Sequence, residues 1–576
     1  MIASLGEPKE SRQRSKRAEW LGAAAIAAAV APAILLLGWI NRYGINVPVG
    51  DEWALVPFFE KWRNHQLTFA DLYRQHNEHR ILVPKLIYLA FADLTNWNLR
   101  AEMFFSATLC AGTSAGIYVL LRRTVGGPPG KVLLIWAAAN LLLFSPAQAQ
   151  NWLWGFQLQM FIPNLCFVMT LVVLTSEWKW NAKFAASVLL SAVATFSFGA
   201  GLLLWPVIAL FLALRGESRW RVAAWLVVGA VVVALYLPGY YRVPRPQPST
   251  GNWLEYPGYF LAFLGGALVR RAGGELPVAA MIIGTVALAF YAFMFAYFLR
   301  ARGEVLRKAA SWLVFAPFVI GSAALAAYSR VNWGATQALE SRYVSTSLYL
   351  YLGLVVLAAI AMRPMTQTAF IGTTAVLTLA AFPAGVGEMA SLHRQHLAGL
   401  GALQFSRVID TTGRLRRDLR MIPGFAPEPS RYVRKLRRMR LLQYRQRRSP
   451  VLENTAQDST RTPGEFGSLD EFRRHEAESF EVSGWAILPE RGRPAPLVAL
   501  AYREGDRWMA FAFADVWQSR NDIAARFRRR SYQASGWRAS FMRQSVPAHA
   551  EGISAWAVDP LANKVHKLAG EQALPK

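Results

Sequence analysis

Acidic, imidazole and basic side chains gather in one stretch of the 576-residue chain, directly after its first long apolar run. A carboxylate there can take a proton as a general base, and ionisable groups at the end of a membrane span are usually functional. The alternative interpretation is a solvated loop whose charges only keep it out of the bilayer. The candidate residues of this stretch are Asp51, Glu52, His76, Glu78, His79, Arg80 and Lys85.

Two further polar clusters follow at predicted helix junctions. Residues 148–159 hold four glutamines, one asparagine and two tryptophans, among them Trp154 and Gln157, and amides with indoles suit a polyol. The third cluster pairs Arg330 with Arg342 and Tyr343. These arginines can bind a lipid phosphate through bidentate contacts, or they can simply snorkel at the membrane surface.

The composition indicates a polytopic membrane protein. Hydrophobic residues make up 54% of the chain and charged residues only 17%. The net charge of +27 falls largely in short loops between apolar runs and in one arginine-rich stretch, which favours topology signals and anionic headgroups over nucleic acid. No phosphate-binding glycine motif is present, so we expect no ATP. Cys110 and Cys166 lie in apolar runs and are expected to be core residues.

The order of apolar and basic segments predicts about eleven membrane spans, with the N-terminus inside and the C-terminus outside. Residues 1–19 form a basic cytoplasmic flank, and Trp20–Ile40 is an uncleaved anchor. Phe184–Leu214 is expected to be two short helices broken at Ser197–Gly201, and Tyr259–Val269 a re-entrant or interfacial segment. The other expected spans are 101–121, 132–144, 156–174, 222–237, 276–298, 312–328, 345–362 and 369–386.

Beyond the spans, residues 387–450 are predicted to be an arginine-rich helical connector and 451–475 a linker. Tyr432, Leu436, Met439 and Leu442 recur at helical spacing, which indicates an amphipathic helix on lipid or on the protein's own flank, or else a solvated face. In residues 476–576 the hydrophobic period changes to two, and about six strands predict a β-sandwich-like domain that can bind glycans. Three tryptophans in these strands are expected in its core: Trp485, Trp537 and Trp556.

This layout resembles the C-class (GT-C) superfamily of membrane glycosyltransferases, through Asp51-Glu52 in the first outer loop and the topology around it. The resemblance implies a catalytic domain over 20–386, with the first outer loop at 41–100 and interfacial helices near Leu67–Tyr73 and Ile81–Leu94. It implies a polyprenyl-phosphate-linked sugar as donor, a glycan or lipid acceptor, and a bacterial inner-membrane location with the C-terminal domain outside.

The resemblance implies a role for Asp51, and side-chain chemistry suggests roles for the other candidate residues. Asp51 would be the general base and Glu52 the second candidate. No cofactor is required, although a divalent metal held by Asp51, Glu78 and His79 stays open. The remaining roles are donor-phosphate binding by Arg80, Lys85, Arg330 and Arg342, and sugar binding by His76, Glu78, His79, Trp154, Gln157 and Tyr343.

Two other classes of function are compatible with the sequence. A transporter or flippase of lipid-linked glycans would show internal repeats and charges at mid-membrane, whereas here the charges fall at the ends of spans. A non-catalytic glycan-binding assembly protein would tolerate changes at Asp51 but not in the β domain.

Overall fold

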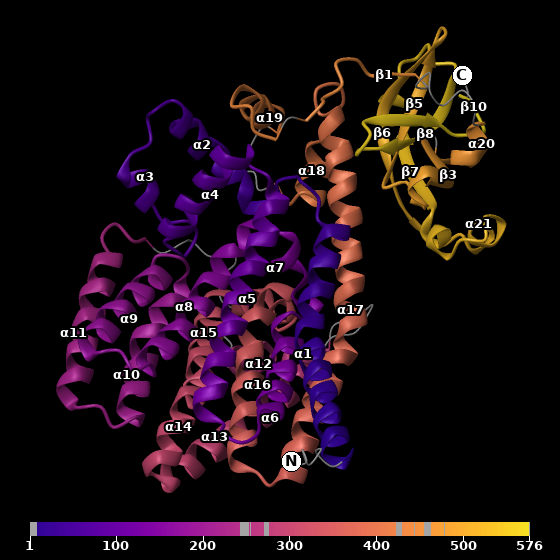
Figure 1. The fold of residues 1–576 in the computed structure, drawn as a ribbon. Helices are drawn as coiled ribbons and strands as arrows, with labels where there is room; N and C mark the ends of the chain where they lie inside the picture. Colours follow the sequence, from indigo (N-terminus) through magenta and orange to yellow (C-terminus); the bar gives the residue numbers. More distant parts are fainter. Residues whose placement is uncertain are drawn as a thin grey trace, which may run out of the picture. The chain divides into compact units, whose positions relative to one another are not determined.

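The chain divides into two compact units in the computed structural model, and each is described by itself (Figure 1). The helical unit comprises Met1–Gly44 and Leu67–Ala390, and the mixed unit comprises Ile45–Gln66 and Ser391–Lys576. The segment that carries Asp51 therefore belongs with the C-terminal part of the chain, which the sequence did not predict. The described residues are 9–241, 253, 255–269, 276–421, 429–442, 444–453, 462–476 and 478–574, so the predictions for residues 1–8 lie outside them.

Apolar helices dominate the helical unit, and nine helical segments among the described residues are long and apolar enough to cross a membrane. They correspond to nine of the predicted spans. The segments are Gly22–Tyr43, Leu99–Thr124, Pro129–Leu153, Gly155–Leu174, Arg219–Tyr236, Pro277–Ala301, Gly303–Trp333, Ser341–Ala361 and Pro364–Phe405. The helices of this unit are α1 (Lys9–Tyr43), α3 (Phe69–Tyr73), α4 (Leu82–Thr95), α5 (Leu99–Thr124), α6 (Pro129–Leu143), α7 (Ala149–Leu153), α8 (Leu158–Leu174), α9 (Trp180–Thr195), α10 (Leu204–Leu214), α11 (Arg219–Tyr236), α12 (Glu255–Gly265), α13 (Pro277–Ala301), α14 (Gly303–Leu313), α15 (Phe315–Arg330), α16 (Ser341–Ala361) and the first part of α17 (Pro364–Phe405).

The predicted break in residues 184–214 is confirmed. Helix α9 ends at Thr195, a 3-10 turn covers Gly199–Leu203, and α10 starts at Leu204. Gly201 is required at this break, because a Cβ atom there would lie 2.0 Å from the carbonyl oxygen of Ala194. Helices α9 and α10 are the two predicted spans that fall outside the nine.

Helix α12 contains only 11 residues, which is too short to cross a bilayer. It lies directly against α13, because glycines let the two backbones touch. A Cβ atom on Gly265 would lie 1.9 Å from the carbonyl oxygen of Ala280, and one on Gly284 would lie 2.1 Å from that of Leu261. Packing of this kind, through small residues, holds helices together where lipid gives no hydrophobic driving force.

The mixed unit ends in one antiparallel sheet rather than the predicted sandwich (Figure 1, yellow). The strand order is β10-β8-β5-β6-β7-β3-β2, and backbone bonds from Leu469 and Ala569 bring the β2 edge to the segment before β10, so the sheet is nearly closed. Register shifts in the β2–β3, β5–β6 and β6–β7 pairs bend the strands enough for this. The strands are β1 (Val451–Leu452), β2 (Gly467–Glu476), β3 (Ser479–Leu488), β4 (Arg493–Pro494), β5 (Leu497–Glu504), β6 (Arg507–Gln518), β7 (Gly536–Met542), β8 (Gly552–Asp559), β9 (Lys564–Lys567) and β10 (Gln572–Ala573).

The prediction of a linker over 451–475 is wrong in its second half, because most of strand β2 lies there. The many charged residues of β2 interrupt the alternation of apolar and polar residues that would have indicated a strand. Trp485, Trp537 and Trp556 are buried, as predicted for core residues. The helical elements of the mixed unit include a 3-10 turn at Gly50–Ala54, α2 (Leu55–Arg63), the end of α17, α18 (Thr412–Asp418), α19 (Pro429–Arg438), α20 (Pro463–Phe466) and α21 (Asn521–Arg526).

The arginine-rich connector differs from its prediction. Helix α17 continues past the predicted end of the last span to Phe405, and α19 is a separate short helix. Val433 and Leu436 on α19 are buried, and Lys435 forms an ion pair with Glu60 of α2. The apolar face of this helix is therefore packed on the protein's own flank, with Arg434 on the exposed face.

The α12–α13 contact yields a stability prediction. Gly265→Ala is expected to lower the unfolding free energy by about 1–3 kcal/mol, because the new methyl group overlaps the Ala280 carbonyl and forces the helices apart. The matched control is Gly372→Ala in α17, where a Cβ atom meets nothing within 4 Å. Thermal unfolding of both variants in detergent, followed by tryptophan fluorescence, measures the difference. Equal melting temperatures would contradict the packing described.

Candidate functional site

A tight turn presents the two predicted histidines of the helical unit. The backbones of His76 and His79 are paired by N–H···O bonds of 2.7 and 3.0 Å, and Asn77 takes a left-handed conformation with φ of 48°. Asparagine tolerates this conformation better than most residues. Gln75 anchors the start of the turn through bonds to the backbone of Asn77 and Tyr241.

Arg80 holds the turn in place. Its guanidinium donates to the carbonyl oxygens of Tyr73, Tyr236 and Pro238, and its backbone N–H donates to the Tyr236 hydroxyl. The cation also lies 4.1 Å from the centre of the Tyr73 ring. Because the side chain is 2% exposed and each of its nitrogens is bonded to backbone, the geometry argues against the predicted phosphate-binding role for Arg80.

Lys85 has a comparable structural position. Its ammonium donates to the carbonyl oxygens of Asp71, Leu72 and Arg74 at 2.9, 3.0 and 2.6 Å, which satisfies the carbonyls at the end of α3. Burial lowers the pKa of Lys85 from its ordinary 10.5 to about 8, with Arg74 adding to the effect. All three N–H groups are committed to carbonyls, so the geometry does not favour phosphate binding by Lys85 either.

The turn meets the other two polar clusters. The His76 ring lies 5.1 Å from the ring of Phe156, and the His79 ring lies 4.1 Å from that of Phe198 in the break before α10. Glu78 faces Arg330 at 3.5 Å. Residues from four distant parts of the sequence therefore share one site.

Helix direction explains this convergence. Successive apolar segments run in opposite directions, with α14 and α15 together forming one of them, so the end of α9, the start of α10, the end of α11, the end of α15 and the start of α16 fall at one end of the unit. Helices α3 and α4 lie at that end (Figure 1), and the Val83 N–H bonds to the Phe196 carbonyl there. The opposite helix ends carry the basic turns, among them Arg122, Arg123, Lys179, Arg215, Arg219, Arg300, Arg307 and Arg363.

Arg330 and Arg342 pair with carboxylates, whereas Arg80 is bonded to backbone carbonyl groups. Arg330 forms a loose ion pair with Glu78 at 3.5 Å, and Arg342 pairs at 2.9 Å with Glu340, whose charge also acts on Arg330. The Nε atom of Arg342 has no hydrogen-bond partner among the described residues. Both guanidinium groups therefore keep N–H donors for a further anion.

A buried hydrogen-bond chain supports this region. The Tyr259 hydroxyl bonds to the Gln337 side chain, whose amide donates to the Tyr343 hydroxyl at 2.9 Å. The Tyr343 ring in turn lies 5.2 Å from the Arg342 guanidinium. Tyr259 belongs to α12, so the helix that is too short to span positions the predicted sugar-binding Tyr343. Sequence reasoning missed Tyr259 and Gln337, because neither has a charged or motif-forming neighbour.

The glutamine-rich segment is buried and packs against the start of α16. Asn151 donates to the Arg342 carbonyl and to the Ser345 hydroxyl, each at 2.9 Å. Trp154 and Gln157 are 7% and 4% exposed, and the Trp154 ring stacks near Phe156 at 6.0 Å. Several buried polar atoms of the segment have no hydrogen-bond partner among the described residues, which is uncommon for buried groups. They are Gln150 Oε1, Asn151 Oδ1, Trp154 Nε1 and Gln159 Oε1.

The predicted bases lie in the mixed unit. Glu52 is 1% exposed, and its carboxylate accepts the Val49 backbone N–H at 2.7 Å, which caps the turn that follows. This capping role argues against Glu52 as a base. Asp51 is half-buried in the first turn of the same 3-10 helix, whose Gly50 N–H bonds to the Leu419 carbonyl.

Within the described part of the chain, no group of three or more His, Cys, Asp and Glu side chains is placed to hold a metal ion. The set named from the sequence, Asp51 with Glu78 and His79, is divided between the two units. Glu78 forms an ion pair with Arg330, and the His79 ring packs on the Phe198 ring.

Comparisons with known proteins identify no family for this chain. No protein-family model matches the chain, and no curated protein or solved structure matches it either.

The low pKa of Lys85 predicts a pH effect on stability. Between about pH 8 and 10.5 the unfolded chain keeps the Lys85 proton while the folded protein releases it, so the Lys85 contribution to the unfolding free energy rises with pH. The melting temperature of wild type should therefore rise relative to Lys85→Met from pH 7 to pH 10. The exposed Lys308, changed to Met, is the control and should show no such trend. A Lys85→Met difference that is constant with pH would refute the assignment.

Proposed function

We propose that this protein is a membrane glycosyltransferase that moves a sugar from a polyprenyl-phosphate donor to a glycan or lipid-glycan acceptor of the cell envelope. The observation that carries the proposal is the pair of arginines, Arg330 and Arg342, at the helix ends where three polar clusters meet. A lipid phosphate is anchored by its chain among apolar helices, so its headgroup is expected where such helices end.

The contacts of the four basic side chains of the site support phosphate binding by Arg330 and Arg342 rather than by Arg80 and Lys85. Arg80 and Lys85 are committed to backbone carbonyls, whereas Arg330 and Arg342 pair with carboxylates and keep further donors. A planar guanidinium binds phosphate oxygens through two N–H groups at once. As the bond from the sugar to the phosphate breaks, the phosphate leaves with the electron pair, and the two cations stabilise its charge.

The surroundings of the arginines suit a sugar. His76, Glu78 and His79 are only partly buried, and Phe156 and Phe198 place aromatic rings beside the two imidazoles. The unpartnered Trp154 N–H and the amide oxygens of the glutamine-rich segment add hydrogen-bonding capacity in the same region. Rings and amides together match a ligand that has apolar ring faces and hydroxyl edges.

The transfer also needs a base. The acceptor hydroxyl loses its proton to a carboxylate as its oxygen bonds to the anomeric carbon. We retain Asp51 for this role on the strength of the GT-C resemblance. The contacts of the helical unit add Glu78 as the second candidate, in place of Glu52. With the basic helix ends cytoplasmic, the Arg330 end of the unit faces outward, which is where such donors are used.

The arginine pair provides the first test. Arg330→Gln and Arg342→Gln should each weaken donor binding at least tenfold, because each removes a charge-assisted contact worth about 1.5–3 kcal/mol. Arg300→Gln, which removes an exposed arginine at the opposite helix ends, is the matched control. Binding of a radiolabelled polyprenyl-phosphate sugar to purified protein is the measurement. If both variants bind donor as wild type does, the phosphate site is elsewhere.

The base is tested separately by turnover. Asp51→Asn should leave donor binding intact and slow sugar transfer by roughly 10²–10⁴-fold, the usual contribution of a general base. Glu78→Gln and Glu52→Gln are compared under the same conditions, with a membrane glycan extract as acceptor. A large loss in Glu78→Gln alone would move the role to Glu78. If wild type binds donor but transfers nothing, a flippase or an assembly protein becomes the better account.

A further inference from the structure

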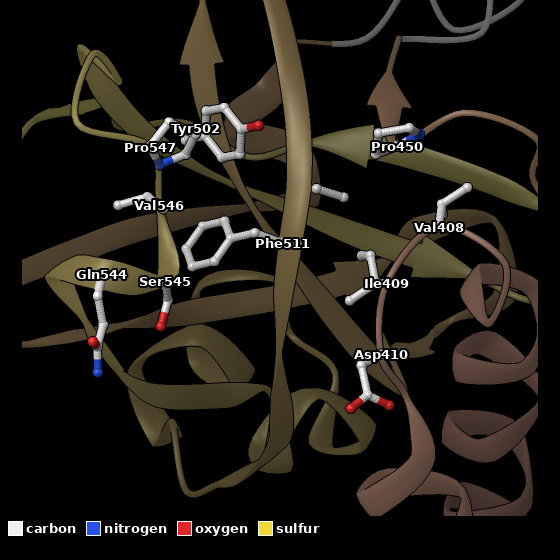
Figure 2. Close-up of a pocket in the computed structure, with 11 residues that line it drawn as sticks. Val408, Ile409, Asp410, Pro450, Tyr502, Phe511, Gln544, Ser545, Val546 and Pro547 are labelled. Atoms are coloured by element: carbon white, nitrogen blue, oxygen red, sulfur yellow. The ribbon is translucent and has the colours of Figure 1, made fainter.

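A hollow of about 530 Å³ opens on the mixed unit, and none of the residues assigned above lines it (Figure 2). Its volume falls in the range of roughly 300–1,000 Å³ that is usual for ligand sites. Its walls are residues 408–410 between α17 and α18, Pro450 just before β1, strands β5 and β6, and the turn at residues 544–547. The lining residues are Val408, Ile409, Asp410, Pro450, Tyr502, Ala510, Phe511, Gln544, Ser545, Val546 and Pro547.

The walls are held in place by the protein itself. The Arg543 guanidinium donates to the carbonyl oxygens of Val546, Pro547 and Ala548, which fixes the turn on one side. On the other side, the N–H groups of Val408 and Ile409 bond to the Phe405 carbonyl at 2.9 and 3.1 Å. The hollow is therefore preformed, and binding there requires little ordering of the protein.

Aromatic rings form the middle of the hollow. Figure 2 shows Phe511 between the two walls, with Ile409 and Asp410 on one side and Gln544 and Ser545 on the other. The Phe511 ring lies 6.2 Å from the Tyr502 ring and makes an edge-on contact with the buried Phe541 ring at 5.2 Å. Both lining rings are half-buried, so one part of each stays open to a ligand.

The rim carries hydrogen-bonding groups that the fold does not use. The Tyr502 hydroxyl, the Gln544 amide and the Ser545 hydroxyl bond to no other group among the described residues. Asp410 is the one charged side chain among the eleven lining residues. The backbone N–H of Thr412 lowers the pKa of Asp410, so this carboxylate is ionised at neutral pH.

We infer that the hollow binds a short stretch of neutral glycan. Sugar rings combine an apolar face, which the Phe511 and Tyr502 rings can cover, with hydroxyl groups that the rim can bond. The lining offers no cation and one carboxylate, so phosphorylated or carboxylated ligands are disfavoured. The inference stands apart from the transferase proposal, because it concerns binding in the absence of any donor.

The test measures oligosaccharide binding to the full-length protein in detergent by saturation-transfer difference NMR. The probes are neutral hexasaccharides of glucan, mannan, galactan and arabinan, and a galacturonan hexamer of equal length. At least one neutral hexamer should bind, and the galacturonan should bind at least tenfold more weakly. Failure of all neutral probes, or equal binding of the acidic probe, would overturn the inference.

Two variants locate the binding. Gln544→Ala combined with Ser545→Ala removes two exposed rim groups without touching the core, and it should weaken the neutral probe about tenfold. Ile409→Arg fills the hollow with a long side chain and should abolish binding. Trp517→Ala is the control, because Trp517 is an exposed aromatic residue on the same strand as Phe511 but outside the lining. Loss of binding in the control, with the rim and filling variants unaffected, would place the glycan elsewhere.

Discussion

The contacts of Arg80 determine the shape of the candidate site in the helical unit. One buried guanidinium joins the end of α3 to the end of α11 and fixes the turn that lies between α3 and α4. His76, Glu78 and His79 owe their positions to this cation. Without it, three carbonyl oxygens would lose a charged donor, and the turn would not be held against Phe156, Phe198 and Arg330.

Around this fixed turn, the cations of the site have separate tasks. Arg80 and Lys85 organise backbone, and Arg330 and Arg342 keep donors for an external anion. Tyr259 on α12 stabilises the arginine side of the site through Gln337 and Tyr343. The close α12–α13 contact thus has a functional consequence, since it places a helix that is too short to span where it can support the site.

Local pattern accounts for what the sequence predicted correctly. Apolar runs gave the long helices, the glycines at 199 and 201 gave the break, and alternation gave most strands. The errors involve non-local bonds. Ile45–Gln66 joins the mixed unit through partners such as Leu419 and Lys435, far along the chain. The sequence does not reveal which carbonyl groups Arg80 and Lys85 will bond. It also does not reveal the register shifts that bend the strands and nearly close the sheet.

Under the proposed function, Arg330 and Arg342 bind the phosphate of a lipid-linked donor. The most direct measurement is cryo-electron microscopy of the full chain in a lipid nanodisc with a bound polyprenyl phosphate. We expect headgroup density within hydrogen-bond distance of both guanidinium groups, with Arg80 and Lys85 still bonded to their carbonyls. Density at the basic helix ends near Arg215 and Arg300, or at Arg80 and Lys85 with Arg330 still paired to Glu78, would overturn this assignment of the phosphate site.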